Sequence, residues 1–178
     1  MSVKVTYKII TAGDGAVGKT TLLHRYVDGY FDFDSKMTIG VEIHRKVVNL
    51  EDKVTCDLQL WDFGGQERFR FLLDSFTKGA QGAFLMFDLT RIGTLLNLDE
   101  WVDIVRKYNT NIPIILLGSK LDLPEAVTFN DAKAEEYLKK YEFSHYLKVS
   151  SKTGQNVEKA FELLLEEILK THAPQLLM

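Results

Sequence analysis

The residues best suited to chemistry form the segment Gly13-Asp14-Gly15-Ala16-Val17-Gly18-Lys19-Thr20. Two glycines with four residues between them precede a lysine and a threonine, which is the pattern of a phosphate-binding loop (P-loop). The glycines allow successive backbone N–H groups to point at phosphate oxygens without a Cβ in the way. We expect a helix from Lys19 whose positive end faces the phosphates, the Lys19 ammonium on the β- and γ-phosphates, and the Thr20 hydroxyl on Mg²⁺.

A second candidate segment, Trp61-Asp62-Phe63-Gly64-Gly65-Gln66, ends an apolar extended run. A carboxylate at this point is what a P-loop site uses to anchor the magnesium shell. Gly65 offers an unobstructed N–H to the γ-phosphate, and the Gln66 amide has the donor and the acceptor needed to orient an attacking water. Taken alone, Asp62 would fit a surface turn, but beside a P-loop the metal role is favoured.

The elements that must position these segments alternate between strand and helix. We predict a strand over Val3–Ala12 that runs into the glycine-rich turn, and a helix over about Lys19–Gly29. The segment Asp32–Gly40 is polar and has no periodicity, so it is predicted to be a loop.

Two extended segments follow, Val41–Leu50 and Val54–Asp62, joined by a polar turn at Glu51-Asp52. They must be antiparallel, because a parallel pair needs a long crossover. Continuous apolar runs at Ala83–Phe87 and Ile112–Gly118 are typical of strands that are covered on both faces.

Helices are predicted after these strands, over about Leu98–Tyr108 and Asp131–Lys140. The last helix has apolar residues at three- and four-residue spacing over Val157–Leu169, with glutamates and a lysine on its other face. The chain is therefore predicted to be an α/β protein with a mostly parallel sheet, in which ligands bind at the carboxyl ends of the strands.

Two more motifs, Gly118-Ser119-Lys120-Leu121-Asp122 and Val149-Ser150-Ser151-Lys152, complete a set that spans nearly the whole chain. Together with the P-loop and Asp62-x-x-Gly65-Gln66, they resemble the Ras superfamily of small GTPases. The resemblance implies a P-loop NTPase with a Ras-like G domain: a mostly parallel six-stranded sheet, one antiparallel edge hairpin, and helices on both faces. It also implies one G domain over residues 1–172 and a short tail over residues 173–178.

The same resemblance implies a role for each motif. Asp122 would accept hydrogen bonds from the guanine N1–H and exocyclic amine, and the Lys120 stem would lie along the base. The implied Mg²⁺ ligands are Thr20, Thr38 and Asp62, and the implied catalytic residues are Gln66 and Lys19. Phe31 would pack on the base edge, and the Ser151-Lys152 backbone would meet the guanine oxygen. The residues implied to bind GTP or GDP are Asp14, Gly15, Ala16, Val17, Gly18, Lys19, Thr20, Thr21, Phe31, Thr38, Gly65, Ser119, Lys120, Asp122, Ser150, Ser151 and Lys152.

The sequence is most similar to the Rab branch, through Thr38-Ile39-Gly40-Val41-Glu42, Trp61-Asp62, Gln66-Glu67-Arg68-Phe69 and Gly79-Ala80. The double glycine of WDFGGQ is typical of Arf-like proteins, and GDGAVGKT resembles the Rho branch. Ser119 stands where the family usually has an asparagine that contacts the base and connects the base loop to the P-loop. The shorter side chain predicts weaker nucleotide affinity or faster exchange, with guanine preference retained through Asp122.

The resemblance implies a GTP/GDP switch that binds Mg²⁺, hydrolyses GTP slowly by itself, and acts in Rab-like membrane traffic or related signalling. Its expected partners are the guanine nucleotide and, through the switch regions, protein effectors, an exchange factor and a GTPase-activating protein. We expect a monomer. One alternative is a P-loop small-molecule kinase, although no insert that could carry an acceptor pocket is visible. Another is a nucleotide-bound scaffold without hydrolysis, against which Gln66 argues.

Composition narrows the choice further. The 178 residues fit one compact domain, and a net charge of −3 with scattered basic residues disfavours nucleic-acid binding. No signal peptide or membrane-length apolar run is visible, so we expect a cytoplasmic protein, with peripheral membrane attachment as the alternative. No lipid anchor is visible, because the sequence lacks a C-terminal cysteine and a glycine at position two, so either the C-terminus is shortened or the protein works without an anchor. The single cysteine, Cys56, excludes an internal disulfide and is expected to be buried.

Two groups of residues receive no assigned role. The four histidines, His24, His44, His145 and His172, show no metal-ligand spacing, so no metal role is expected for them. The apolar residues Phe69, Phe71, Leu72 and Leu73 fit either the core or a partner-binding surface.

Overall fold

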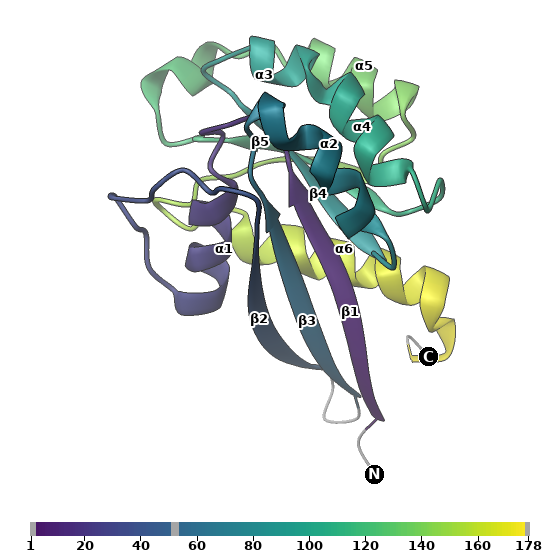
Figure 1. The fold of residues 1–178 in the computed structure, drawn as a ribbon. Coiled ribbons are helices and arrows are strands. Elements are labelled where there is room, and N and C mark those ends of the chain that lie inside the picture. The colour runs from purple at the N-terminus through teal and green to yellow at the C-terminus, as the bar shows by residue number, and fades with distance from the viewer. Residues whose placement is uncertain (1–2, 51–53, 177–178) are drawn as a thin grey trace.

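The computed structural model describes residues 3–50 and 54–176, apart from the side chains of Phe69 and Val127. Its centre is a six-stranded sheet in the order β2-β3-β1-β4-β5-β6, in which only the β2–β3 pair is antiparallel (Figure 1). The strands are β1 (Val3–Ala12), β2 (Val41–Leu50), β3 (Val54–Phe63), β4 (Gly82–Asp88), β5 (Ile114–Ser119) and β6 (His145–Lys148). The predicted α/β architecture with an antiparallel edge hairpin is confirmed.

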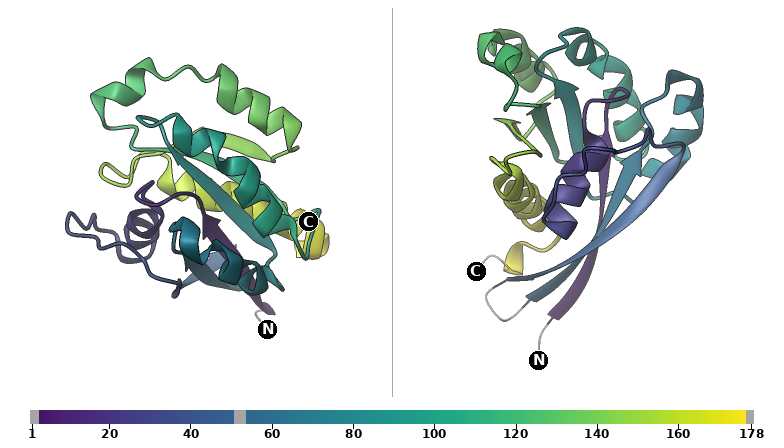
Figure 2. Two further views of the ribbon diagram at one scale, coloured as in Figure 1. Left: turned by 45° about the horizontal axis from the view of Figure 1, so that its top comes forward. Right: turned by 90° about the vertical axis from the view of Figure 1, so that its left-hand side faces the viewer.

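Helices lie on both faces of this sheet (Figure 2). Side chains of α1 and α6 belong to one buried apolar cluster, and side chains of α4 and α5 belong to the other. The α-helices are α1 (Lys19–Asp28), α2 (Arg70–Leu73), α3 (Gly93–Leu96), α4 (Leu98–Arg106), α5 (Ala132–Lys140) and α6 (Val157–His172). Short 3₁₀ helices are Glu67–Phe69, Asp74–Thr77, Pro124–Thr128 and Pro174–Leu176.

Alternate side chains along β1 contribute to the two clusters. Tyr7 and Ile9 pack with α1 and α6, whereas Ile10 and Ala12 pack on the opposite face. Every residue of β4 and β5 is buried, as their continuous apolar runs predict. Cys56 is buried within β3, which confirms its prediction.

Element ends differ from the sequence prediction in a few places. β5 begins at Ile114 instead of Ile112, because Pro113 has no N–H to donate to the sheet, although its carbonyl accepts a hydrogen bond from Ala83 at 3.0 Å. The helix predicted to reach Tyr108 ends at Arg106. The predicted turn at Glu51-Asp52 lies outside the described residues.

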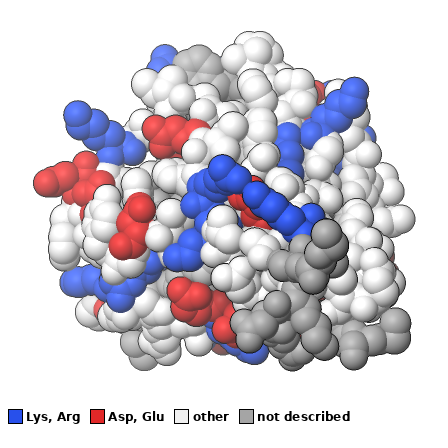
Figure 3. Space-filling model, turned by 90° about the horizontal axis from the view of Figure 1, so that it is seen from below, with Lys and Arg blue, Asp and Glu red and all other residues white. Residues whose placement is uncertain are grey.

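Parallel pairing places the carboxyl ends of β1 and β4 at one edge of the sheet, with the P-loop directly after β1. Seen from below, acidic and basic side chains are interspersed over the face drawn (Figure 3). Among the described residues, no helix is long and apolar enough to cross a membrane.

Gly82 allows α6 to pack closely on β4, and its replacement by valine tests this packing. A Cβ at Gly82 would lie 2.6 Å from Cδ1 of Ile168 and 3.1 Å from Cδ1 of Leu164. Valine is favoured in strands, so any loss of stability reports overpacking. We expect Gly82→Val to lower the free energy of unfolding by about 1–3 kcal/mol in urea titrations.

Gly93→Ala is the matched control, since a Cβ there meets no atom within 4 Å. Its unfolding midpoint should equal or slightly exceed that of the wild type. A Gly82→Val protein as stable as the wild type would show that α6 does not pack tightly on this strand.

Candidate functional site

The P-loop joins the end of β1 to the start of α1 in a conformation that needs its glycines. Gly13 has a φ of 145°, and a Cβ there would lie 2.3 Å from the carbonyl oxygen of Met86 on β4. Gly18, at the N-terminal end of α1, has a φ of 99°. The loop is thus held against β4, and α1 begins where anion-binding N–H groups are needed.

Lys19 is almost completely enclosed by this loop. Its residue is 5% exposed, and its ammonium donates to the carbonyls of Gly13 at 2.8 Å and Asp14 at 2.7 Å. Burial lowers the pKa of Lys19 to about 8, although the carboxylates of Asp62 and Asp14 act in the opposite direction. A buried cation of this kind is suited to a polyanionic ligand.

A cavity of about 550 Å³ lies over the P-loop and has the size of a small-ligand site. Its lining includes most of the sequence-predicted binding residues: Gly15, Ala16, Val17, Gly18, Lys19, Thr20, Thr21, Phe31, Thr38, Gly65, Ser119, Lys120, Asp122, Ser151 and Lys152. Neither Asp14, Asp62, Gln66 nor Ser150 is among the described residues that line it. Sequence reasoning missed Phe33, Lys36, Met37 and Leu123, which also line the cavity and carry no motif.

The Thr20 and Thr38 side chains line one end of the cavity, and both contact Asp62, which does not line it. The Thr20 hydroxyl donates to Oδ2 of Asp62 at 2.5 Å, and the Thr38 hydroxyl reaches the same oxygen at 3.2 Å. The other oxygen of Asp62 is buried without a hydrogen-bond partner among the described residues. Burial raises the pKa of Asp62, and its hydrogen bonds offset this only in part. An enclosed, incompletely satisfied set of hard oxygens fits Mg²⁺.

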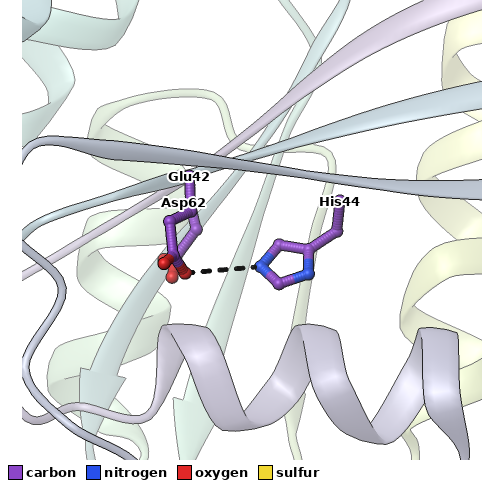
Figure 4. Close-up of side chains that lie close together, drawn as sticks. All are labelled: Glu42, His44 and Asp62. Carbon is purple, nitrogen blue, oxygen red and sulfur yellow. Dashed lines mark ion pairs between the residues drawn. The ribbon is translucent and has the colours of Figure 1, made fainter.

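His44 lies beside this group. Its position in the sequence does not predict this proximity. Glu42 pairs across the hairpin with Asp62, and His44 follows two residues later on the same face of β2 (Figure 4). The Nε2 atom of His44 is 3.9 Å from Oε2 of Glu42. The prediction that the histidines bind no metal stays a prediction.

The two motifs that the resemblance assigns to the base meet at the other end of the cavity. Asp122 accepts a hydrogen bond from the Ser150 hydroxyl at 2.6 Å, which connects the two motifs. The Ser119 hydroxyl is buried and lies 2.5 Å from the carbonyl oxygen of Val17 in the P-loop. The connection that an asparagine usually makes is therefore retained by the shorter side chain.

The segment after β3 lies directly on the P-loop. A Cβ at Gly65 would be 2.3 Å from the backbone nitrogen of Gly15, so only glycine fits this approach. Gln66 is half-buried, and its amide contacts Met37 and Arg68. The structure thus brings Gly65 to the P-loop while the Gln66 side chain lies beside the cavity.

The Asp14 side chain points away from the cavity and connects the P-loop to α2 and α4. Its carboxylate accepts hydrogen bonds from Arg70 at 2.6 Å, Asn97 at 2.6 Å and Trp101 at 2.9 Å. The Arg70 guanidinium also lies over the Trp101 ring, 4.8 Å from its centroid, and pairs with Glu100. Sequence reasoning missed this cluster, because its members belong to no motif and are spread over 87 positions.

The apolar residues near α2 divide between core and surface. Leu73 is buried, whereas Phe71 and Leu72 are exposed, and the Phe69 side chain lies outside the described residues. An apolar groove is lined by Ile39, Gly40, Val41, Ile43, Trp61, Leu72, Leu73 and Phe76.

Comparisons with known proteins show what the chain as a whole is similar to. Residues 8–170 match the model of the Ras family. The human Ras-related protein Rab-27B is 41% identical over 92% of this chain and 79% of its own length. Ras-related protein RABA1c of Arabidopsis thaliana is 37% identical over 91% of this chain and 74% of its own. Ras-related protein Rab-2B of Dictyostelium discoideum is 37% identical over 92% of this chain and 81% of its own length.

Replacing Arg70 tests whether the Asp14 cluster holds α2 in place. Arg70→Ala removes the charge-assisted hydrogen bond to Asp14 and the contact with Trp101, so residues 67–77 should open more often. We expect amide hydrogen exchange in this segment to rise roughly tenfold. The matched control is Arg45→Ala, since Arg45 pairs with Asp57 on the β2–β3 hairpin and should leave residues 67–77 unaffected. Unchanged exchange in the Arg70 variant would contradict this role.

Proposed function

The chain belongs to the Ras family of small GTPases, and from this premise we propose that it is a Rab-like guanine-nucleotide switch with slow intrinsic hydrolysis. Binding and hydrolysis of GTP follow from the family. The assignment of each step to particular residues is our proposal. The observation that carries it is the single cavity shared by the P-loop, the Thr20 and Thr38 hydroxyls, and the base-end residues Ser119 and Asp122.

We propose that the P-loop backbone and Lys19 hold the β- and γ-phosphates. The enclosed ammonium of Lys19 would exchange its two carbonyl partners for phosphate oxygens at little cost in desolvation, because its burial already exists without the nucleotide. The N-terminal end of α1 adds a favourable dipole at the same place.

The guanine base would occupy the end of the cavity at Asp122. The Asp122 carboxylate is exposed and accepts a hydrogen bond from the Ser150 hydroxyl. It keeps acceptor capacity for the N1–H and exocyclic amine of guanine. Adenine presents no such pair of donors on that edge. The Lys120 stem, Phe31 and the Ser151-Lys152 backbone complete the base site in this proposal.

Thr20, Thr38 and Asp62 would hold Mg²⁺, with Thr20 as a direct ligand and Asp62 acting mainly through water. When bound, the ion supplies positive charge to the phosphate oxygens. Thr38 lies in the loop between α1 and β2, so its contact with the metal site would depend on the γ-phosphate and would fix this loop in the GTP state.

Hydrolysis requires positioning and charge stabilisation more than a strong base. We propose that Gln66 rotates from Met37 toward the γ-phosphate to orient the water, next to Gly65. Two nearby arginines are engaged elsewhere, since Arg68 donates to Gln66 and Arg70 to Asp14. Intrinsic hydrolysis should therefore be slow, and an activating protein that supplies an arginine could accelerate it by roughly 10³–10⁵-fold.

The partners of this switch would bind where nucleotide-dependent segments meet. The apolar groove between Ile39, Trp61 and Phe76 draws on both the loop before β2 and the segment after β3. We propose that effectors, an exchange factor and an activating protein contact this region, and that the switch acts in Rab-like membrane traffic.

Asp122→Asn tests the assignment of the base site. Loss of the two charge-assisted hydrogen bonds should weaken GTP binding by roughly 10–100-fold and favour xanthine nucleotides, whose base edge complements an amide. Competition between fluorescent GDP and unlabelled GTP, XTP and ATP measures both effects. The control is Asp103→Asn, at an exposed aspartate on α4, which should leave the affinities for GTP and XTP unchanged. ATP binding as tight as GTP binding to the wild type would refute the assignment.

Gln66→Leu tests the proposed catalytic role. Single-turnover hydrolysis of bound GTP should lose most of its rate, while GTP affinity stays near that of the wild type, because the amide acts on the water and not on the nucleotide. Gln175→Leu, at an exposed glutamine near the C-terminal end, is the control and should hydrolyse GTP normally. An unchanged rate in the Gln66 variant would mean that another group positions the water.

A further inference from the structure

Asp88, the last residue of β4, has an unusually complete set of partners for a residue that no motif includes. Its side chain is fully buried. One oxygen accepts hydrogen bonds from the backbone and hydroxyl of Thr90, and the other lies 2.8 Å from the Lys120 ammonium and 2.9 Å from Nε of Arg91. Burial raises the pKa of this carboxyl, but the hydrogen bonds from Lys120, Thr90 and Arg91 outweigh burial and lower it to about 2. The group is therefore a permanent buried anion.

Arg91 also donates to the P-loop. Its Nη2 atom donates to the carbonyl oxygen of Gly15 at 3.2 Å, while Nε of the same guanidinium is bound to Asp88. Lys120, on the same carboxylate, comes from the base-recognition motif. A continuous polar path thus runs from Lys120 through Asp88 and Arg91 to the backbone that would hold the phosphates.

We propose that Arg91 is a positioning residue for nucleotide retention, which couples the base site to the P-loop through Asp88. This inference rests on the proposed function, because it concerns the two ends of the same nucleotide site. Release of the nucleotide requires these ends to separate or loosen. The Arg91 connection opposes that movement, in parallel with the contact between Ser119 and Val17.

The planar guanidinium is essential to this role. It presents several donors in a fixed arrangement, so one side chain can bind a carboxylate and a carbonyl at once. A lysine carries a single compact ammonium, which cannot occupy the two separate positions that Nε and Nη2 of Arg91 hold against Asp88 and Gly15. Arg91→Lys should therefore keep the charge near Asp88 but lose the connection to Gly15.

The test compares nucleotide release with hydrolysis. We expect Arg91→Ala to accelerate dissociation of fluorescent GDP roughly tenfold, which is the effect of losing one charge-assisted hydrogen bond, and to leave single-turnover hydrolysis of bound GTP unchanged. Arg91→Lys should release GDP nearly as fast as the alanine variant. The Arg91 side chain is 46% exposed, so these substitutions should leave the urea unfolding midpoint of the GDP-loaded protein close to that of the wild type.

Two further variants separate this role from general effects. Arg45→Ala removes another arginine–aspartate pair, on the β2–β3 hairpin, and should release GDP at the wild-type rate. In Asp88→Asn, the additional replacement Arg91→Ala should add little to the release rate, because both act through the same connection.

Three results would overturn the inference. GDP dissociation from Arg91→Ala at the wild-type rate would show that the Arg91 contact does not contribute to nucleotide retention. Slower hydrolysis with unchanged release would make Arg91 a group acting on the phosphates and not a positioning residue. Full additivity of the Asp88 and Arg91 substitutions would show that they act separately. Failure of the wild-type protein to bind GDP at all would refute the proposed function as well, so the two failures are distinguishable.

Discussion

The enclosed ammonium of Lys19 is the interaction on which the rest of the site depends. Burying a cation is unfavourable unless it is paired, and here two P-loop carbonyls accept hydrogen bonds from it. This geometry demands a loop fixed at both ends. β1 and the tight approach of Gly13 to β4 fix one end, and the start of α1 fixes the other. A polyphosphate is the ligand that such an arrangement satisfies best.

Parallel strand order explains how distant residues share one cavity. Ser119 and Asp88 occupy paired positions at the ends of β5 and β4, so the base motif lies beside the P-loop although 102 positions separate Ser119 from Val17. The antiparallel hairpin serves a different purpose: β2 runs away from this edge and β3 returns parallel to β1, which places Asp62 beside Thr11 at the same edge. The proposed metal-binding and base-binding ends are therefore placed by sheet topology, and the residues proposed to contact the nucleotide lie mostly in the loops.

Sequence alone could predict the parts whose chemistry restricts residue type. The P-loop glycines, Lys19 and the buried strands β4 and β5 belong to this class, because phosphate binding and two-sided burial leave few alternatives. β6 consists of four half-buried residues without a periodic pattern, so the sequence does not predict where this strand lies. Contacts such as that of Arg91 with Gly15 depend on how the loops meet after folding, so neither residue type nor local spacing predicts them.

The nucleotide that accompanies the purified protein tests the central claim most directly. The protein would be isolated in the presence of Mg²⁺ and denatured, and the released nucleotide would be identified and quantified by ion-exchange chromatography against standards. A guanine-nucleotide switch should release GDP or GTP, close to one molecule for each protein chain, with adenine nucleotides absent. Release of ADP or ATP in comparable amount, or a protein without nucleotide that shows no saturable binding of GTP, would contradict it.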